Sequence, residues 1–522
     1  MCFFQGLLRS LLLIHNSFFN IIFLGNCNTN KQKLIKRKET TIFQFIVNIC
    51  ARFAFVMGAA MLLPVLADLR YNNRDWETFL YPCAITTVLA TLVFLATRGA
   101  TYRFSARLGF TLTVCLWLTG SIVGALPLYL SPLKISLAKA IFESVSGITT
   151  TGSTVIAGLD HLPQSLLLWR SLICWIGGIG FIGLALLLLP SLRVGGVQLF
   201  HMESSDKSEK ILPRINQIAN GIIIAYIGLT FSCMLSYFAA GMTLFDAINH
   251  AMSTVATAGF STHDTSFGYF SEKPTILVVS TIFMFLSSLP FVLYIKLVFP
   301  SHSKRFIDPQ IVVFFNIVFL SSFTLAIWLQ FNTSLTFHQI FLDTIFHIVS
   351  IISTTGYSAQ DYQLWGSFAF GVFFIISFIG GCAGSTSGGI KINRLIILWR
   401  IAQANMVRLF SPNTIVKVRY DHSNISSDIA QTVLLFVCLY MFCLLIGTAL
   451  LLATGLDFTS AFTGVLTALS NVGPGFGNII GPTGNFSTIH DNALWVLSFL
   501  MLVGRLEIVT IFVFFTAAFW SE

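Results

Sequence analysis

Four short segments rich in glycine, threonine and serine recur along the chain at spacings of roughly a hundred residues. They are residues 148–154, 256–261, 353–358 and, in a looser form, 471–476. Glycine adopts backbone conformations that are costly for residues with a Cβ, so such segments can aim successive carbonyl oxygens at one axis. Rings of carbonyl oxygens can replace the hydration shell of a monovalent cation. The pattern therefore predicts four loops that together coordinate a permeating cation.

The candidate ligands are the glycine of each segment and the residues beside it. They are Thr150, Thr151, Gly152, Thr257, Ala258, Gly259, Thr354, Thr355, Gly356, Val472, Gly473, Pro474 and Gly475. In the fourth segment we align Gly475 with Gly152, Gly259 and Gly356. Glycine, serine and threonine are also common packing residues in membrane helices, but four copies at matching places favour a selectivity filter over packing alone.

Polar residues also recur upstream of the glycines. Six positions before the first three glycines stand Ser146, Ser253 and Ser350, and nine positions before them stand Glu143, His250 and His347. The fourth copy has Ser470 one residue out of register and no polar counterpart in the second column. We interpret Glu143, His250 and His347 as polar residues that brace the backs of the short helices. A role as proton carriers is the alternative.

The composition is that of a membrane protein. Hydrophobic residues make up 55% of 522 positions and charged residues only 10%, against roughly 25% charged residues in ordinary soluble domains. The mean hydropathy is +0.82. The net charge of +9 comes from residues in short connections between apolar spans, so it indicates topology and not nucleic-acid binding. The ten cysteines form no CxxC pair and are interpreted as buried small hydrophobic residues.

The filter segments belong to a repeated unit of an apolar span, a half-length helix and a second apolar span. The half-length helices are expected at 135–148, 244–256, 336–353 and 459–471, and the second spans at 163–190, 274–299, 364–405 and 491–519. A helix this short cannot cross about 30 Å of hydrocarbon, so it must enter and turn back. Such backbone is tolerated only inside protein or beside a watery cavity. The sequence thus predicts an all-α polytopic membrane protein with four span/pore-helix/filter-loop/span units around a central pore, plus an accessory N-terminal helix pair.

The chain divides into six parts on this reading. They are 1–41, an extra segment that is either a peripheral helix or an over-long gene start; 42–100, the accessory pair with spans at 44–69 and 78–97; and the pore repeats 101–195, 196–300, 301–410 and 411–522. Basic residues concentrate in the connections on one side, and by the positive-inside rule that side is cytoplasmic. They are Arg98, Arg103, Arg107, Arg193, Lys207, Lys210, Arg214, Lys304, Arg305, Arg408, Lys417 and Arg419. Both termini are then cytoplasmic.

The second span of the third repeat is too long for one crossing and is interrupted by a run of small residues, 380–389. Each glycine costs a helix about 1 kcal/mol relative to alanine, so we expect a mobile intramembrane loop, with a plain kink as the alternative. Its candidate gating residues are Gly384, Ser385, Thr386, Ser387, Gly388 and Gly389. Neither a phosphate-binding loop nor a serine nucleophile elbow fits, because no Gly-Lys-Ser/Thr follows and Thr386 stands where the serine would be.

Arg505 is expected in the middle of the last span. An ionised side chain there is costly unless it faces protein or water. Glu507 lies two residues on and points to another helix face, so it is a poor partner within the helix. A buried ion pair with a carboxylate on another helix is the alternative to a pore-facing position.

From about residue 42 to the end, the chain resembles the Trk/Ktr/HKT superfamily of potassium transporters, and within it the bacterial TrkH/TrkG subunits. Besides the filter segments, the motifs that carry the resemblance are Trp-Ile-Gly-Gly-Ile-Gly-Phe at 175–181, Gly-Ser-Thr-Ser-Gly-Gly-Ile-Lys at 384–391, Asn-Val-Gly-Pro-Gly at 471–475 and Gly-Arg-Leu-Glu at 504–507. Glycine in all four filter copies implies potassium selectivity. The resemblance also implies a gate beneath the filter, with Arg505 reaching toward the pore as a barrier to cations.

The resemblance further implies a cytosolic nucleotide-binding regulatory subunit of the TrkA type, a homodimer with one pore per protomer, and a multi-pass location in the bacterial inner membrane. The basic connections 193–214 and 391–419 could dock that subunit or lipid headgroups. No nucleic-acid partner and no organic cofactor are expected, and potassium is the substrate.

The leading hypothesis is potassium uptake driven by the membrane potential, which supplies about 2.3 kcal/mol per charge per 100 mV without a catalytic site. One alternative couples potassium to a proton or a sodium ion, with Glu143, His250, His347 and Arg505 as the candidate residues. A remote alternative, an intramembrane enzyme, lacks the HExxH, GxGD and serine-elbow signatures. We therefore expect no enzymatic activity.

Overall fold

The computed structural model describes residues 30–71, 73–99, 106–188, 211–298, 308–414, 416–421, 423–506 and 508–520. Within these ranges six helices are long and apolar enough to cross a membrane, or up to eight if each of two bent helix pairs counts as one span. A two-residue antiparallel hairpin, β1 Arg419–Tyr420 with β2 Ser423–Asn424, is the one sheet in these ranges. Most of the predicted segment 1–41 lies outside the described residues, as do Arg103, Arg193, Lys207, Lys210, Lys304, Arg305 and Glu507.

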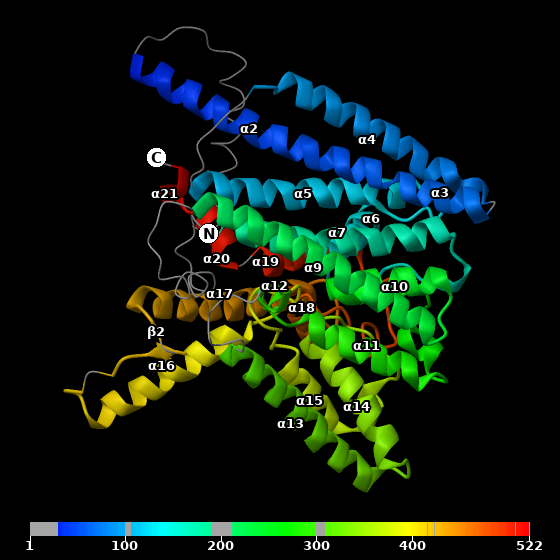
Figure 1. The fold of residues 1–522 in the computed structure, drawn as a ribbon, viewed down its shortest axis with the longest axis vertical. Helices are drawn as coiled ribbons and strands as arrows, with labels where there is room; N and C mark the ends of the chain where they lie inside the picture. The colour runs from blue at the N-terminus through cyan, green and yellow to red at the C-terminus, as the bar shows by residue number, and fades with distance from the viewer. Residues whose placement is uncertain are drawn as a thin grey trace.

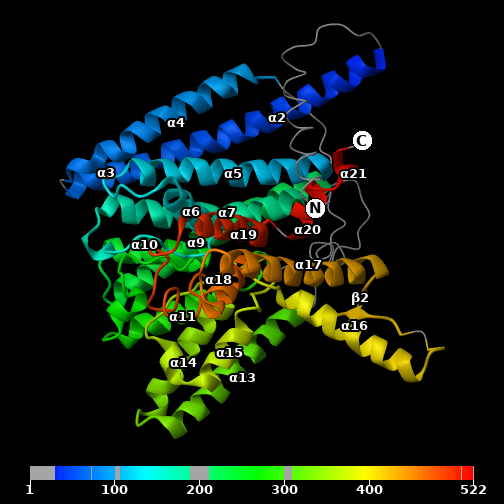
Figure 2. The same cartoon turned by 180° about the vertical axis from the view of Figure 1, so that it is seen from behind.

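The accessory pair forms as two antiparallel spans. The first combines α2 (Asn30–Ala60) with α3 (Leu62–Tyr71), and the second is α4 (Glu77–Ala96). The apolar spans run over Ile42–Tyr71 and Glu77–Ala96, close to the predicted ranges. Helix α2 packs against both α4 and α5 (Ala106–Leu130), and Figures 1 and 2 place the pair along one edge of the molecule.

The remaining helices follow the predicted order of four units. The first has α5, α6 (Leu137–Ile148) and α7 (Gln164–Leu188); the second has α9 (Ile211–Ala239), α10 (Leu244–Ala256), α11 (Pro274–Ser287) and α12 (Phe291–Val298); the third has α13 (Pro309–Asn332), α14 (Phe337–Ile352), α15 (Ser367–Ile376) and α16 (Ile392–Phe410); the fourth has α17 (Ser427–Leu452), α18 (Phe458–Ser470), α19 (Asp491–Arg505), α20 (Ile508–Phe514) and α21 (Ala517–Trp520). The four half-length helices α6, α10, α14 and α18 agree with the predicted ranges to within two residues.

Each half-length helix has a serine, threonine or aspartate at its N-cap position. The N-cap residues are Ser136, Thr243, Thr336 and Asp457. Ser136 Oγ, Thr243 Oγ1 and Asp457 Oδ2 each accept a hydrogen bond from the backbone N–H three residues on, at 3.3, 3.1 and 3.0 Å. The first N–H groups of a helix have no partner within the helix, so these caps define where the turn into the membrane begins.

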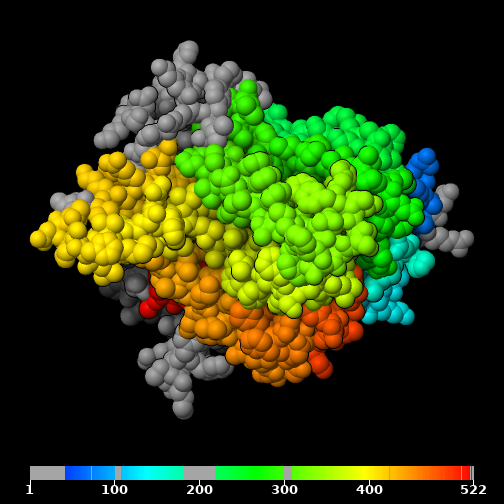
Figure 3. Space-filling model, turned by 90° about the horizontal axis from the view of Figure 1, so that it is seen from below, coloured from blue at the N-terminus to red at the C-terminus, as the bar shows by residue number. Residues whose placement is uncertain are grey.

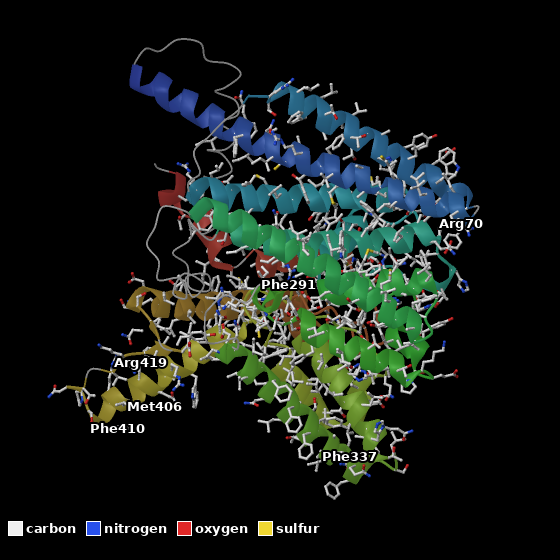
Figure 4. The ribbon with its side chains drawn as sticks, in the orientation of Figure 1. Arg70, Phe291, Phe337, Met406, Phe410 and Arg419 are labelled. Atoms are coloured by element: carbon white, nitrogen blue, oxygen red, sulfur yellow. The ribbon has the colours of Figure 1, made fainter. Side chains whose placement is uncertain are left out.

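The second spans of the second and fourth units differ from the prediction, because each is broken into two helices. Helices α11 and α12 meet at an angle of 91° across the break before Phe291, and Figure 4 shows Phe291 in the middle of the molecule. The predicted apolar span 274–299 is therefore divided between two helices. Pro290 explains the break, since proline lacks an N–H and clashes with the preceding turn. The predicted span 491–519 is likewise interrupted, and Arg505 is the last residue of α19, not the middle of a helix.

The long helices give the molecule two ends. Figure 4 shows Arg70 at one end and Arg419 and Met406 at the other. Helix α16 and the hairpin after it extend beyond the packed body at the second end (Figures 1 and 3). The predicted division between a basic side and an opposite side is thus compatible with the path of the chain.

Close helix packing at Gly177 provides a test of this arrangement. A Cβ at Gly177 on α7 would lie 1.9 Å from the carbonyl oxygen of Ile148 at the end of α6. We expect Gly177→Ala to destabilise the protein by about 1–3 kcal/mol through overpacking, measured as a lower melting temperature of the detergent-purified protein. Gly180→Ala on the same helix is the control, since nothing lies within 4 Å of its added Cβ. Equal melting temperatures for the two variants would contradict the packing.

Candidate functional site

The four filter loops share one backbone conformation. One or two residues after each half-length helix comes a residue with left-handed backbone, and these residues are Thr150 (φ 55°), Thr257 (φ 53°), Thr354 (φ 59°) and Asn471 (φ 55°). Two residues later comes a glycine with positive φ, and these glycines are Gly152 (86°), Gly259 (80°), Gly356 (78°) and Gly473 (107°). The residue between them donates its N–H back into the helix, to Ser146, Ser253, Ser350 and Thr467 respectively, at 2.8–3.0 Å. The repeat seen in the sequence is therefore a repeat of backbone geometry.

This geometry corrects the register of the fourth segment. Gly473, not Gly475, is the counterpart of the other three glycines. Thr467 stands six positions before Gly473 and accepts the N–H of Val472, so it takes the place of the upstream serine that Ser470 was expected to occupy. The Gly475 N–H instead donates to the Ile480 carbonyl at 2.7 Å. If threonine had been accepted at the position of the upstream serine, the sequence would have shown that Gly473 aligns with the other three glycines.

The glycines bring the four loops into a closed ring. A Cβ on Gly152 would lie 2.0 Å from the Ala258 carbonyl oxygen, and one on Gly259 2.0 Å from that of Thr355. A Cβ on Gly356 would lie 2.0 Å from the Val472 carbonyl oxygen, and one on Gly473 2.7 Å from that of Thr151. Each loop thus touches the next, and the fourth returns to the first. No side chain fits at these contacts, which is why glycine is required.

Hydrogen bonds join neighbouring loops around the ring. Between the first and fourth loops, Ser153 Oγ donates to the Gly473 carbonyl at 2.9 Å, and Asn471 Nδ2 donates to Thr151 Oγ1 at 2.9 Å. Between the third and fourth, Ser358 Oγ donates to the Pro482 carbonyl at 2.7 Å. Buried polar groups held in this way make the ring a preorganised element.

The upstream polar residues hold the outer part of each loop. Glu143 Oε2 accepts the Val155 N–H at 2.8 Å, and His347 Nε2 accepts the Ala359 N–H at 3.1 Å. His250 Nε2 lies 3.0 Å from Ser261 Oγ. In the fourth repeat Thr463, one position earlier than the aligned column, accepts the Phe476 N–H at 3.0 Å. These contacts agree with the interpretation of the residues as braces.

The tautomer of His347 follows from its partners. Its Nε2 accepts backbone N–H groups, and its Nδ1 lies 2.7 Å from the Asp343 carbonyl oxygen. A ring nitrogen that accepts carries no proton, whereas one that faces a carbonyl must donate. The ring is therefore neutral, with its proton on Nδ1.

The run of small residues in the third repeat forms a loop, not a kink. Helix α15 ends at Ile376 and α16 begins at Ile392. Between them, Thr386 Oγ1 lies 3.1 Å from the Val255 carbonyl and 3.2 Å from the Ser287 carbonyl. The Gly388 N–H donates to Thr354 Oγ1 at 2.7 Å. The loop therefore rests against the inner ends of the second and third filter loops.

The same loop also touches the fourth repeat. A Cβ at Gly388 would lie 2.2 Å from the Ser470 carbonyl oxygen. Between α11 and α12, the Ser288 carbonyl accepts the Cys382 N–H, and the Phe291 N–H donates to the Gly384 carbonyl, both at 3.0 Å. The backbone groups freed by the broken span are thus satisfied by the loop, as irregular backbone at membrane depth requires.

A small cavity beside this loop is lined by cationic side chains. Its volume is about 20 Å³, which is room for a single water molecule. It is lined by Ser387, Gly388, Gly389, Lys391, Arg394, Phe436, Gly504 and Arg505. Arg505 is 2% exposed, Lys391 Nζ donates to the Ser387 carbonyl, and the Arg394 guanidinium lies 4.0 Å from the centre of the Phe436 ring. The predicted gating residues and Arg505 are therefore brought together.

Sequence reasoning missed a histidine bridge on the outer side of the ring. His263 Nδ1 lies 2.5 Å from Asp160 Oδ1, and Nε2 lies 3.6 Å from Asp246 Oδ1. The ring stacks on Tyr269 with centroids 3.6 Å apart. Burial alone would lower the pKa of His263, but the Asp246 and Asp160 carboxylates raise it above the ordinary value. The sequence signal for this bridge was a histidine next to an aspartate in both segments, at 160–161 and 263–264.

This bridge predicts a pH dependence of stability. Because the folded-state pKa of His263 is raised, its ionic contribution is fully present below the unfolded value of about 6.5 and is lost as pH rises through the folded-state value. We expect the difference in melting temperature between wild type and His263→Gln to be larger near pH 6 than near pH 9. His161→Gln, in the same outer region, is the control. A difference that does not change with pH would contradict the ion pair.

Comparison with known proteins agrees with this architecture. Residues 77–522 match the family described as TrkH, cation transport protein. The Trk system potassium uptake protein TrkI of Halomonas elongata is 39% identical over 91% of this chain and 97% of its own. The Trk system potassium uptake protein TrkH of Escherichia coli K12 is 34% identical over 92% of this chain and 100% of its own.

A solved structure shares the fold. The crystal structure of the potassium transporter TrkH from Vibrio parahaemolyticus superposes with a TM-score of 0.84 at 33% identity, covering 92% of this chain and 99% of that one. Matches of this extent, in sequence and in structure, cover all four repeats. The chain therefore belongs to the TrkH family of cation transport proteins, and it is an integral membrane transporter, not an enzyme.

Proposed function

We propose that this protein takes up potassium across the bacterial cytoplasmic membrane through the ring of four filter loops. The observation that carries the proposal is the closed contact between each filter glycine and the carbonyl of the next loop. Relatives covering nearly the whole chain are named as Trk system potassium uptake proteins, which supports the choice of ion.

In this proposal the ion is coordinated by backbone carbonyl oxygens of the filter loops. The ligands come from Thr150, Thr151, Gly152, Thr257, Ala258, Gly259, Thr354, Thr355, Gly356, Asn471, Val472 and Gly473. Gly473 takes the role first assigned to Gly475, because its backbone matches the other three glycines. Carbonyl dipoles replace the hydration shell without burying a full negative charge. The membrane potential drives the ion inward at about 2.3 kcal/mol per charge per 100 mV.

The loop between α15 and α16 is the gate in this proposal. Its contacts with Val255, Thr354 and Ser470 support a closed position against the inner ends of the filter loops. Lys391, Arg394 and Arg505 beside it raise the local potential, which opposes a cation. A cytosolic nucleotide-binding subunit of the TrkA type moves the loop by docking on the inner surface, which includes α16.

The orientation and assembly follow the same proposal. The basic end carrying Arg408 and Arg419 faces the cytoplasm with both termini, and the filter loops open outward. Two copies form a homodimer with one pore in each. Uncoupled conduction is favoured over proton coupling, because both ring nitrogens of His250 and of His347 have hydrogen-bonding partners within their own repeat.

The filter is tested by serine substitutions at the ring glycines. Gly152→Ser and Gly473→Ser place a Cβ against the neighbouring carbonyl, so we expect them to lower the ratio of potassium to sodium permeability at least about tenfold, the scale of one lost ligand contact. Gly475→Ser is the matched control, since its Cβ would meet side chains, chiefly Ile480, and no carbonyl of the neighbouring loop. The measurement is ion flux and potassium-dependent growth of an uptake-deficient bacterium expressing each variant with a cognate regulatory subunit.

The outcomes separate the parts of the proposal. Failure of the wild type to restore growth would reject potassium uptake. Restoration with unchanged selectivity in Gly473→Ser would reject the ring as the filter. A reversal potential that follows an imposed proton or sodium gradient would reject uncoupled conduction.

The gate is tested at the contact of Thr386. Thr386→Val keeps the side-chain volume but removes the hydroxyl between the Val255 and Ser287 carbonyls. We expect severalfold higher potassium flux in the absence of the regulatory subunit, measured in liposomes, because the closed loop loses the one hydrogen bond that this hydroxyl donates, about 1 kcal/mol. Thr448→Val is the control, since its hydroxyl bonds only to Leu444 within α17. Equal flux in both variants would count against this loop as the gate.

A further inference from the structure

A buried ion pair joins the first repeat to the filter ring of the second. Glu143 lies on α6 and Arg170 on α7, and each is 1% exposed. Arg170 Nε lies 2.8 Å from Glu143 Oε1. Removing two charges from water is costly, and well-packed apolar residues often stabilise a protein equally well. The position of the pair therefore requires an explanation other than stability alone.

The pair contacts the outer part of the first filter loop. Glu143 accepts hydrogen bonds from the Val155 N–H at 2.8 Å and from Thr154 Oγ1 at 2.9 Å. Arg170 Nη2 donates to the same Thr154 hydroxyl at 3.2 Å. Thr154 and Val155 follow Gly152 by two and three residues. The pair thus holds the segment immediately outside the first ring glycine.

Arg170 also reaches across to the second loop. Its Nη1 donates to the Ser261 carbonyl at 3.1 Å, and its guanidinium lies 4.2 Å from the centre of the Phe260 ring. Phe260 and Ser261 directly follow Gly259. The planar Arg170 guanidinium therefore connects the first and second loops, which touch each other at Gly152 and the Ala258 carbonyl.

The other three braces described above are different in kind. His250, His347 and Thr463 are held by neutral hydrogen bonds, and each braces the loop of its own repeat. Ser261 is held from both sides, by His250 at its hydroxyl and by Arg170 at its carbonyl. Beside the ring glycines, the charged Arg170 fork thus links the first loop to the second.

We propose that Glu143 and Arg170 are a positioning pair that sets the spacing between the first and second filter loops and thereby the selectivity for potassium over the smaller sodium ion. The inference rests on the proposed function. Neither side chain touches the ion; they act through Thr154, Val155, Phe260 and Ser261. A fork with fixed geometry can do this, whereas the point charge of a lysine cannot.

The test compares Arg170→Lys with the neutral double variant Glu143→Gln/Arg170→Gln. Arg170→Lys keeps the charge opposite Glu143 but loses the fork to Ser261. We expect potassium flux to remain and the ratio of potassium to sodium permeability to fall about tenfold, the scale of one charge-assisted hydrogen bond. The double variant leaves no unpaired buried charge, so it tests the same effect on the permeability ratio if Arg170→Lys does not fold. Its selectivity should fall as well.

Arg52→Lys is the control for the substitution itself. Arg52 lies 5.1 Å from the centre of the Phe94 ring in the accessory pair, away from the filter, so its replacement should leave selectivity unchanged. Wild-type selectivity in a conducting Arg170→Lys or double variant would overturn the positioning role. A wild type without potassium flux would instead reject the proposed function, which is a distinguishable failure.

Discussion

The structure depends on one close contact that is made four times. Each filter glycine lies so near a carbonyl of the next loop that no Cβ could be accommodated. This contact requires four loops with the same positive-φ backbone, and it requires them at one depth around one axis. The short helices, their caps and the polar braces are the means by which a single chain places four non-identical segments into a closed ring.

The bounds of the half-length helices could be predicted from the sequence because they are local. The ends of α6, α10, α14 and α18 were predicted to within two residues, since each of these short helices stops at a glycine segment. Helix breaks in the second spans were less accessible. The break at Pro290 is stabilised by Cys382 and Gly384, which lie about a hundred residues away in sequence, and such partners are not visible in a local pattern.

The site shows the same limit. Glycines and upstream serines identified three loops, but the fourth was misaligned by two residues, because Thr467 was not accepted in place of serine and Ser470 was taken as the counterpart although it is one residue out of register with Gly475. Backbone φ decides between Gly473 and Gly475, and composition does not. The bridge of His263 with Asp160 and Asp246 joins two loops of different repeats, so only the tertiary structure brings these residues together.

Non-identical repeats allow one repeat to do what a symmetric ring could not. Within the described residues, the third repeat supplies the long small-residue loop, and the break between α11 and α12 supplies backbone groups that bind it. The fourth repeat ends α19 at Arg505, beside the same loop. Divergence among the repeats therefore keeps the filter glycines alike while the segments beneath them specialise.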